Sequence, residues 1–97
     1  MRIAEVIGTV TLSRVHPTLT GARWLIAVPC SLKALSDAQC GDGEDLVVYD
    51  NLGAGSGSLI GIAEGAEAAA PFHPNKTPVD AFCACVLDRV EVKQPLV

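Results

Sequence analysis

The sequence predicts an all-β protein: a small five-stranded β-barrel of the oligonucleotide-binding (OB) type, with at most one short helix. Three observations lead to this prediction. The chain has 97 residues, enough for one modest core and therefore for a single domain over residues 1–97. Its apolar residues, mostly Val, Ile, Leu and Ala, fall in short runs. Turns rich in Gly or Pro separate these runs, and none of them suits a long helix.

The first two strands are predicted as a hairpin. The first covers residues 3–15, where apolar and polar residues alternate. The segment His16–Gly21 supplies the turn, and the apolar run Trp24–Cys30 is the second strand. The alternation in the first strand places Ala4, Val6, Val10 and Leu12 on one face, and Glu5, Thr9, Thr11 and Ser13 on the other.

Two shorter strands follow in the middle of the chain. Residues 32–44 are polar and loosely patterned, so they are predicted as a connection that ends in an Asp-Gly turn. The third strand covers residues 46–49, and a Gly-rich loop occupies residues 50–58. The fourth strand covers residues 59–62, and Gly65 ends it.

The last part of the chain contains one helical turn and the longest apolar strand. Residues 66–70 favour a helix of one turn, which Pro71 ends, and residues 71–78 are predicted as a surface loop. The fifth strand covers residues 79–92. Alternation places Val79, Ala81, Cys83, Cys85 and Leu87 on one of its faces, and Phe82, Ala84, Val86, Val90 and Val92 on the other.

Two predicted strands, residues 24–30 and 79–92, are apolar on both faces. A small barrel buries the inward face of a strand, so the outward face needs a cover. A short helix or a loop of the same chain could provide it, and so could a neighbouring subunit. Because the one helix candidate is a single turn, we expect an obligate oligomer, whose interfaces resemble a domain core cut in half.

Composition excludes several functional classes. The formal net charge is −4, which disfavours binding to nucleic acid or to an anionic membrane. The longest apolar stretches, such as Ala81–Leu87, are far shorter than the ~20 residues of a membrane-spanning helix. Glu5 interrupts the N-terminal apolar stretch, so we expect no export signal and a cytosolic protein. In the cytosol the four cysteines are expected as reduced thiols: Cys30, Cys40, Cys83 and Cys85.

The Gly-rich loop is the feature that most resembles a ligand-binding motif. It contains the run Gly53-Ala54-Gly55-Ser56-Gly57-Ser58. A dinucleotide-binding fingerprint would need a third glycine in place of Ser58 and a helix after it, and a P-loop would need Gly-Lys-Ser/Thr. Neither is present, and a strand is predicted next. The glycines are therefore interpreted as positions of positive φ or of close backbone approach.

No residues with the spacing of a catalytic or metal site are found. The two histidines stand in separate loops, without metal-ligand spacing. Cys83 and Cys85 stand two apart, which could suit a soft metal, but zinc sites place a turn between paired cysteines and add further ligands. Both are interpreted as small buried residues. Asp80 and Asp88 are too far apart along a strand to act as a catalytic pair.

Several segments resemble those of a known family. They are Arg2–Val10, the Leu19-Thr20-Gly21 segment ahead of Trp24–Val28, Tyr49–Gly57, Pro78–Ala81 and Val86–Asp88. The third contains a match to the signature Asp-x-x-Gly-Ala-Gly-x-Gly. Together they resemble the bacterial microcompartment vertex family, which includes carboxysome and ethanolamine-utilisation shell pentamers. The resemblance runs from Arg2 to about Val92.

The resemblance implies a homopentamer of β-barrels, without catalysis or cofactor, in a microcompartment shell within the bacterial cytoplasm. Pentamers of this family occupy the vertices of a polyhedral shell whose facets are hexameric proteins. The loop Gly53–Ser58 is then expected at the five-fold axis and pore or at a subunit interface, where a Cβ at Gly55 would clash between crowded chains or force a conformation that other residues avoid.

Two segments depart from the family pattern and change the expected local charge. Ser58 stands where an acidic residue is frequent, and Gly65–Ala69 replaces a Gly-Ser-Ser-Ala-Arg-like segment. The alternative function is that of a small OB-like module that binds single-stranded nucleic acid. Such a module needs a basic groove and stacking aromatic rings, whereas this acidic chain has four scattered aromatic residues.

Overall fold

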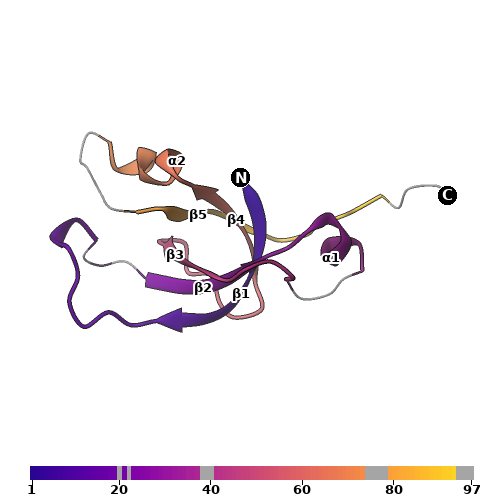
Figure 1. The fold of residues 1–97 in the computed structure, drawn as a ribbon, viewed down its shortest axis with the longest axis horizontal. Helices are drawn as coiled ribbons and strands as arrows, with labels where there is room; N and C mark the ends of the chain where they lie inside the picture. The colour runs from indigo at the N-terminus through magenta and orange to yellow at the C-terminus, as the bar shows by residue number, and fades with distance from the viewer. Residues whose placement is uncertain (20, 22, 38–40, 74–78, 94–97) are drawn as a thin grey trace.

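Five strands form a closed barrel in the computed structural model, which describes residues 1–19, 21, 23–37, 41–73 and 79–93 (Figure 1). Their order around the barrel is β1-β2-β3-β5-β4, and every neighbouring pair is antiparallel except β3 and β5. The predicted all-β barrel is confirmed. The strands are β1 (Arg2–Val10), β2 (Arg23–Pro29), β3 (Leu46–Asp50), β4 (Leu59–Glu64) and β5 (Ala81–Leu87).

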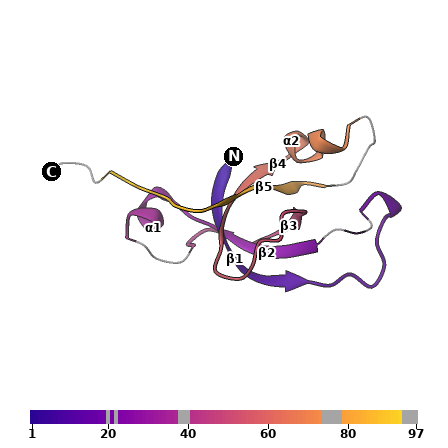
Figure 2. The same cartoon turned by 180° about the vertical axis from the view of Figure 1, so that it is seen from behind.

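Short helical segments connect the strands. They are the 3-10 turns η1 (Pro17–Leu19) and η2 (Ala70–Phe72) and the α-helices α1 (Leu32–Ser36) and α2 (Ala66–Ala69). The predicted single turn at residues 66–70 is confirmed as α2, which continues into η2. Gly65 ends β4 with φ 63°, as its role as a strand stop predicts. The two α-helices lie toward opposite ends of the barrel (Figures 1 and 2).

The helix α1 lies in a segment that was predicted as a plain connection. Its N-cap is Ser31, whose hydroxyl accepts a hydrogen bond from the Ala34 amide at 3.2 Å. The Asp42 carboxylate accepts hydrogen bonds from the Ser31 amide and hydroxyl, at 2.8 and 2.6 Å. These hydrogen bonds hold the pKa of Asp42 below its usual range. The helix is thus stabilised by a residue that follows it in sequence.

Two strands end earlier than the alternation predicts. β1 stops at Val10, which pairs with Trp24 near the start of β2, and the five residues that were predicted to continue the strand have no partner there. β5 stops at Leu87, which pairs with Leu59, the first residue of β4. The ends of the partner strands therefore set both boundaries. Part of the predicted loop 71–78, residues 74–78, lies outside the described residues.

A bulge in β1 changes the predicted faces of that strand. Val6 pairs with Ala27, but Gly8 pairs with Ile26, so Ile7 is an extra residue. Ala4 and Val6 are buried inside the barrel as predicted. Beyond the bulge the faces are exchanged, and Val10 shares the outer face with its partner Trp24. The prediction that Val10 lies on the same face as Val6 is therefore wrong.

A second bulge lies in β5 at Ala84. Cys83 pairs with the buried Ile62, whereas Cys85 pairs with Gly61, so one residue of β5 is left over between them. Alternation predicted that the two cysteines share one strand face. This prediction is wrong, because the bulge places them on opposite faces. Cys83 is buried in the barrel. Cys85 instead lies at Gly61, where an added Cβ would approach the Cys85 sulfur to 2.7 Å.

The interior of the barrel is filled by small and medium aliphatic side chains from all five strands. Leu25, Ile60 and Ile62 are the largest fully buried apolar ones, and no aromatic ring lies in this cluster of described residues. Such a core leaves no room for a ligand between the strands. Its members are Ala4, Val6, Leu25, Ala27, Val48, Ala54, Ile60, Ile62, Ala81 and Cys83.

The four aromatic residues, which the sequence scatters over 59 positions (Trp24 to Phe82), form one cluster outside the barrel. Tyr49 lies at its centre, with ring centroids 5.3 Å from Trp24, 5.0 Å from Phe72 and 5.7 Å from Phe82. Leu19, Ala68 and Val79 complete the cluster. The loop between β1 and β2, α2 with η2, and the outer faces of β2, β3 and β5 thus pack together.

The outward apolar residues are covered by the chain itself in some places and not in others. The aromatic cluster covers the Trp24 end of β2. The loop at Gly41 covers Val28, because an added Cβ there would lie 2.8 Å from Val28 Cγ1. Val47, on the outer face of β3, remains 49% exposed. Val86 is 44% exposed as well, although it pairs with the core residue Ile60 and therefore lies on the inner face of β5. Cover by the same chain is therefore confirmed for part of β2, while the exposed positions of the strands lie on β1, β3 and β5, and cover by a neighbouring subunit stays a prediction.

Candidate functional site: the Gly-rich loop and the edge beside it

The Gly-rich loop is organised by the carboxylate of Asp50, the last residue of β3. Its side chain is fully buried and accepts three backbone hydrogen bonds. The donors are the amides of Leu52 (2.9 Å), Gly53 (3.1 Å) and Ala54 (3.0 Å). This residue was not singled out as a functional residue by itself, although it is the first residue of the family signature. The acidic residue of that signature shapes the loop that follows it.

Arg23 and Cys83 complete the surroundings of Asp50. The Arg23 guanidinium donates from Nη1 to the Ala54 carbonyl oxygen at 3.1 Å and lies 3.4 Å from Asp50 Oδ2. It therefore links the start of β2 to the loop. Burial and the nearby Asp50 charge raise the pKa of the Cys83 thiol to about 12. Cys83 is thus a neutral thiol at physiological pH, which does not suit a metal ligand or a nucleophile.

The six predicted loop residues have different roles. Ala54 is buried in the barrel core, and Gly53 and Gly57 have positive φ angles of 84° and 88°. Gly55 does not have a positive φ, and an added Cβ there would meet no described atom within 4 Å. The prediction that Gly55 holds a conformation that other residues avoid is wrong. Ser56 is exposed and Ser58 is half-buried.

Six of the loop amides donate hydrogen bonds within the chain. Besides the three that Asp50 accepts, the Gly55 amide donates to Ser58 Oγ at 3.3 Å, and the Gly57 amide donates to the Val6 carbonyl at 2.8 Å. The Ser58 amide donates to the Gly55 carbonyl at 3.0 Å. Phosphate-binding loops need free amides and a helix behind them, whereas β4 follows this loop. The interpretation against nucleotide binding is therefore supported by the hydrogen bonding.

The barrel beside this loop closes incompletely. β3 and β5 share a single described register pair, Tyr49 with Phe82, whereas the other neighbouring strands share four to six. Within the described chain, residues 85–87 of β5 pair with β4 alone, Ala84 is the bulged residue, and residues 46–48 of β3 pair with β2 alone. Both stretches are unpaired edges.

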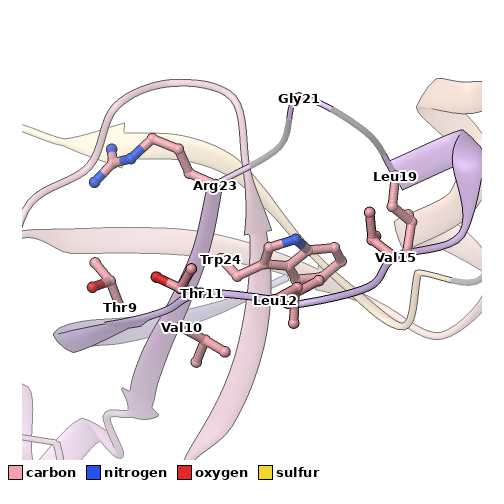
Figure 3. Close-up of a pocket in the computed structure, with 9 residues that line it drawn as sticks. All are labelled: Thr9, Val10, Thr11, Leu12, Val15, Leu19, Gly21, Arg23 and Trp24. Atoms are coloured by element: carbon pink, nitrogen blue, oxygen red, sulfur yellow. The ribbon is translucent and has the colours of Figure 1, made fainter.

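A surface cavity of about 450 Å³ lies where the β1–β2 connection meets β2 (Figure 3). Its walls combine apolar side chains with the hydroxyls of Thr9 and Thr11, and the Arg23 guanidinium points away from the Trp24 ring (Figure 3). It lacks the convergent polar groups of a substrate site. The lining residues are Thr9, Val10, Thr11, Leu12, Val15, Leu19, Gly21, Arg23 and Trp24.

The structure brings together no further set of chemically active side chains among the residues it describes. In this part of the chain no three His, Cys, Asp or Glu side chains are grouped as metal ligands would be. Cys83 and Cys85 are free thiols, and Cys40 lies outside the described residues. Likewise, none of the described helices combines the length and apolar character needed to cross a membrane.

The fold and the site define a class of protein: a small OB-like barrel with a packed core, a Gly-rich loop that makes its hydrogen bonds within the chain, and apolar strand edges that the described chain leaves uncovered. The chain belongs to the EutN_CcmL family, described as ethanolamine utilisation protein EutN/carboxysome, whose model matches residues 1–88. This confirms the resemblance seen in the sequence.

Individual relatives extend over nearly the whole chain. The carboxysome shell vertex protein CcmL of Thermosynechococcus vestitus is 33% identical over 94 residues, which cover 93% of this chain and 86% of that protein. The microcompartment shell vertex protein GrpN of Rhodospirillum rubrum is 29% identical over 91 residues, covering 94% and 97%.

Solved structures of such proteins have the same fold. The pentameric microcompartment shell protein GrpN from Rhodospirillum rubrum superposes with a TM-score of 0.79 at 28% identity, over 96% of this chain and all of that chain. The ethanolamine utilization protein EutN superposes with a TM-score of 0.81 at 25% identity, over 95% of this chain and 91% of that chain.

Proposed function

We propose that this chain is a structural, non-enzymatic shell protein that forms homopentamers at the vertices of a polyhedral bacterial microcompartment in the cytoplasm. The observation that carries the proposal is the end-to-end similarity to proteins named as shell vertex proteins, one of them described as pentameric. The whole chain acts as one vertex domain.

Physical features of this chain support the same role. The barrel core is packed with side chains, and the loop that resembles a phosphate site has its amides engaged. Apolar side chains are exposed on two strands. A protein with these properties buries surface against other subunits and holds no substrate.

The alternative, binding of single-stranded nucleic acid, is not supported. Its aromatic residues would have to present flat faces to successive bases along a basic groove. Here the rings pack against one another, Tyr49 is buried, and the chain carries a net charge of −4. The named relatives are also shell proteins.

The partners in this role are four further copies of the chain and hexameric shell proteins. A flat layer of hexamers has no curvature, so a closed polyhedron needs five-fold units at its corners. The loop Gly53–Ser58 is the candidate for the axis and pore or for a subunit contact. Gly55, Ser56 and Gly57 are exposed on the single chain, which leaves them available for either position.

Two experiments test the proposal. Native mass spectrometry of the purified chain at micromolar concentration should show a pentamer, and a monomer would contradict the assembly. Deletion of the gene, in a strain without a second vertex homologue, should leave open or elongated shells while the enclosed enzymes remain active in lysate. Normal closed polyhedra in that strain, seen by electron microscopy, would refute the vertex role.

A further inference from the structure

The two unpaired edges of the barrel coincide with its exposed apolar side chains. Among the large apolar residues in the described strands, only Ile7, Val47 and Val86 are exposed. Ile7 is the bulged residue of β1. Val47 lies in the stretch of β3 that has no β5 partner, and Val86 lies in the stretch of β5 that has no β3 partner.

The exposure of Val86 follows from a missing neighbour. Val86 pairs directly with Ile60, so the two side chains share one face of the sheet. Ile60 is fully buried because its strand has partners on both sides, β1 and β5. Val86 is 44% exposed because β5 pairs only with β4 at this level. One more strand or chain segment along β5 would cover it.

Apart from the bulge at Ala84 of β5, neither edge carries the features that normally keep an exposed edge from pairing. Natural proteins protect such edges with Lys, Pro or inward charges. Residues 84–87 read Ala-Cys-Val-Leu and residues 46–48 read Leu-Val-Val, with no charge and no proline. Both edges therefore have the composition of surfaces that are covered in the assembled protein.

One neighbour cannot cover both edges at the same place. Tyr49 is level with Phe82, Val47 lies two residues before it and Val86 four residues after it. Six residues of strand separate the two valines by roughly 20 Å along the parallel strands. A ring in which every subunit is equivalent needs two such distinct surfaces, one for each neighbour.

We propose that the β3 edge around Val47 of one copy docks on the β5 edge around Val86 of the next copy, so that the ring completes the open seam of each barrel. The occupant of each edge is thus a second copy of this chain. This assignment rests on the proposed homopentamer and adds its two contact surfaces. The Gly-rich loop, which leaves β3 at Asp50, then lies close to the contact.

Charged substitutions test each edge separately. Val47→Asp and Val86→Asp should each abolish the pentamer in native mass spectrometry, because an unpaired charge is not tolerated in an apolar contact. Leu32→Asp is the matched control, since Leu32 is 69% exposed on α1, which belongs to neither edge, and it should remain pentameric. Circular dichroism should show unchanged strand content in all three.

A mixing experiment tests the pairing itself. Val47→Asp keeps an intact β5 edge and Val86→Asp keeps an intact β3 edge. An equimolar mixture at high concentration should therefore form a dimer with one chain of each variant, while each variant alone stays monomeric. A mixture with only monomers would overturn the pairing of these two edges.

The outcomes separate this assignment from the proposed function. If the unmodified chain is a pentamer and both Asp variants are pentamers too, the edge assignment is wrong and the vertex role stands. If the unmodified chain is a monomer, the pentamer itself is contradicted. Should an Asp variant fail to fold, Val47→Thr and Val86→Thr replace it, and these should shift dissociation to a higher protein concentration than for the unmodified chain.

Discussion

The two ends of strand β3 differ in how completely the chain itself provides hydrogen-bond partners and cover for the residues there. At the carboxyl end, Asp50 accepts three loop amides, and Arg23 links the loop to β2. At the amino end, residues 46–48 pair on one side only and Val47 is exposed. The comparison shows that the polar groups of the loop end are bonded within the chain, whereas the described chain leaves apolar surface uncovered at the other end. Hydrogen-bonding groups need a partner at a fixed distance, whereas apolar surface can be buried later.

Asp50→Ala, at the carboxyl end of β3, is the substitution with the largest expected effect. The substitution removes the acceptor of three backbone amides and leaves Arg23 without its partner charge. We expect a loss of about 3 kcal/mol in the free energy of unfolding. Urea denaturation followed by circular dichroism measures it at one fixed protein concentration. Asp50→Asn keeps the size of the side chain and one acceptor oxygen, so it should lose less; equal losses for the two variants would show that the hydrogen bonds are not the cause.

Two glycines of the loop should differ in how much a substitution lowers the stability of the single chain. Gly57→Ala should cost about 1–2 kcal/mol, because φ is 88° there and a Cβ disfavours it. Gly55→Ala should leave the stability of the single chain within about 0.5 kcal/mol, since φ is not positive and the space is open. Both variants are compared by thermal unfolding under conditions where the chain is monomeric.

Two variants at Gly55 test where the loop lies in the pentamer. If Gly55→Ala weakens the pentamer while the chain itself stays stable, the requirement for glycine at residue 55 comes from a neighbouring copy. An unchanged pentamer in Gly55→Val would remove this loop from the axis and from the subunit contact.

The thiol beside Asp50 should make the stability of the chain depend on pH. The pKa of Cys83 is about 12 in the folded chain, above the ordinary thiol pKa of about 8.5 in the unfolded chain. The unfolded chain therefore loses this proton first, and stability should fall as pH rises above about 8.5. Urea midpoints at pH 8 and pH 10 measure the decline, and Cys83→Ala should reduce it. The same decline in Cys83→Ala would assign it to other groups.

Alternation and turn residues were sufficient to find the strands, because those signals are local. Val-, Ile- and Leu-rich runs bounded by Gly and Pro located all five strands, and Gly65 marked the end of β4. The two bulges could not be found in this way. Ile7 follows the apolar Val6, and residues 81–87 are apolar throughout, so alternation does not mark an extra residue. Only the register with the partner strand shows which one is extra. A bulge is a property of two strands together.

In the candidate site, too, some features have a local sequence signal and others depend on the tertiary structure. The loop run Gly53–Ser58 was found because its glycines are distinctive, but the roles of Asp50 and Arg23 depend on where β3 ends and β2 begins. The capping of α1 by Ser31 had a local signal that the polar composition of the segment obscured. Asp42, whose carboxylate holds this cap, lies in the connection between α1 and β3.

The sequence by itself determined the strands, the absence of a long helix and the family, because hydrophobic periodicity and a motif are written in consecutive residues. Only the tertiary structure decided which apolar faces the chain covers for itself. The cluster of four aromatic rings, the cover over Val28 and the open edges at Val47 and Val86 each depend on which segments meet in space. Burial is shared between segments far apart in the chain, so a residue pattern shows that a face is apolar but not what lies against it.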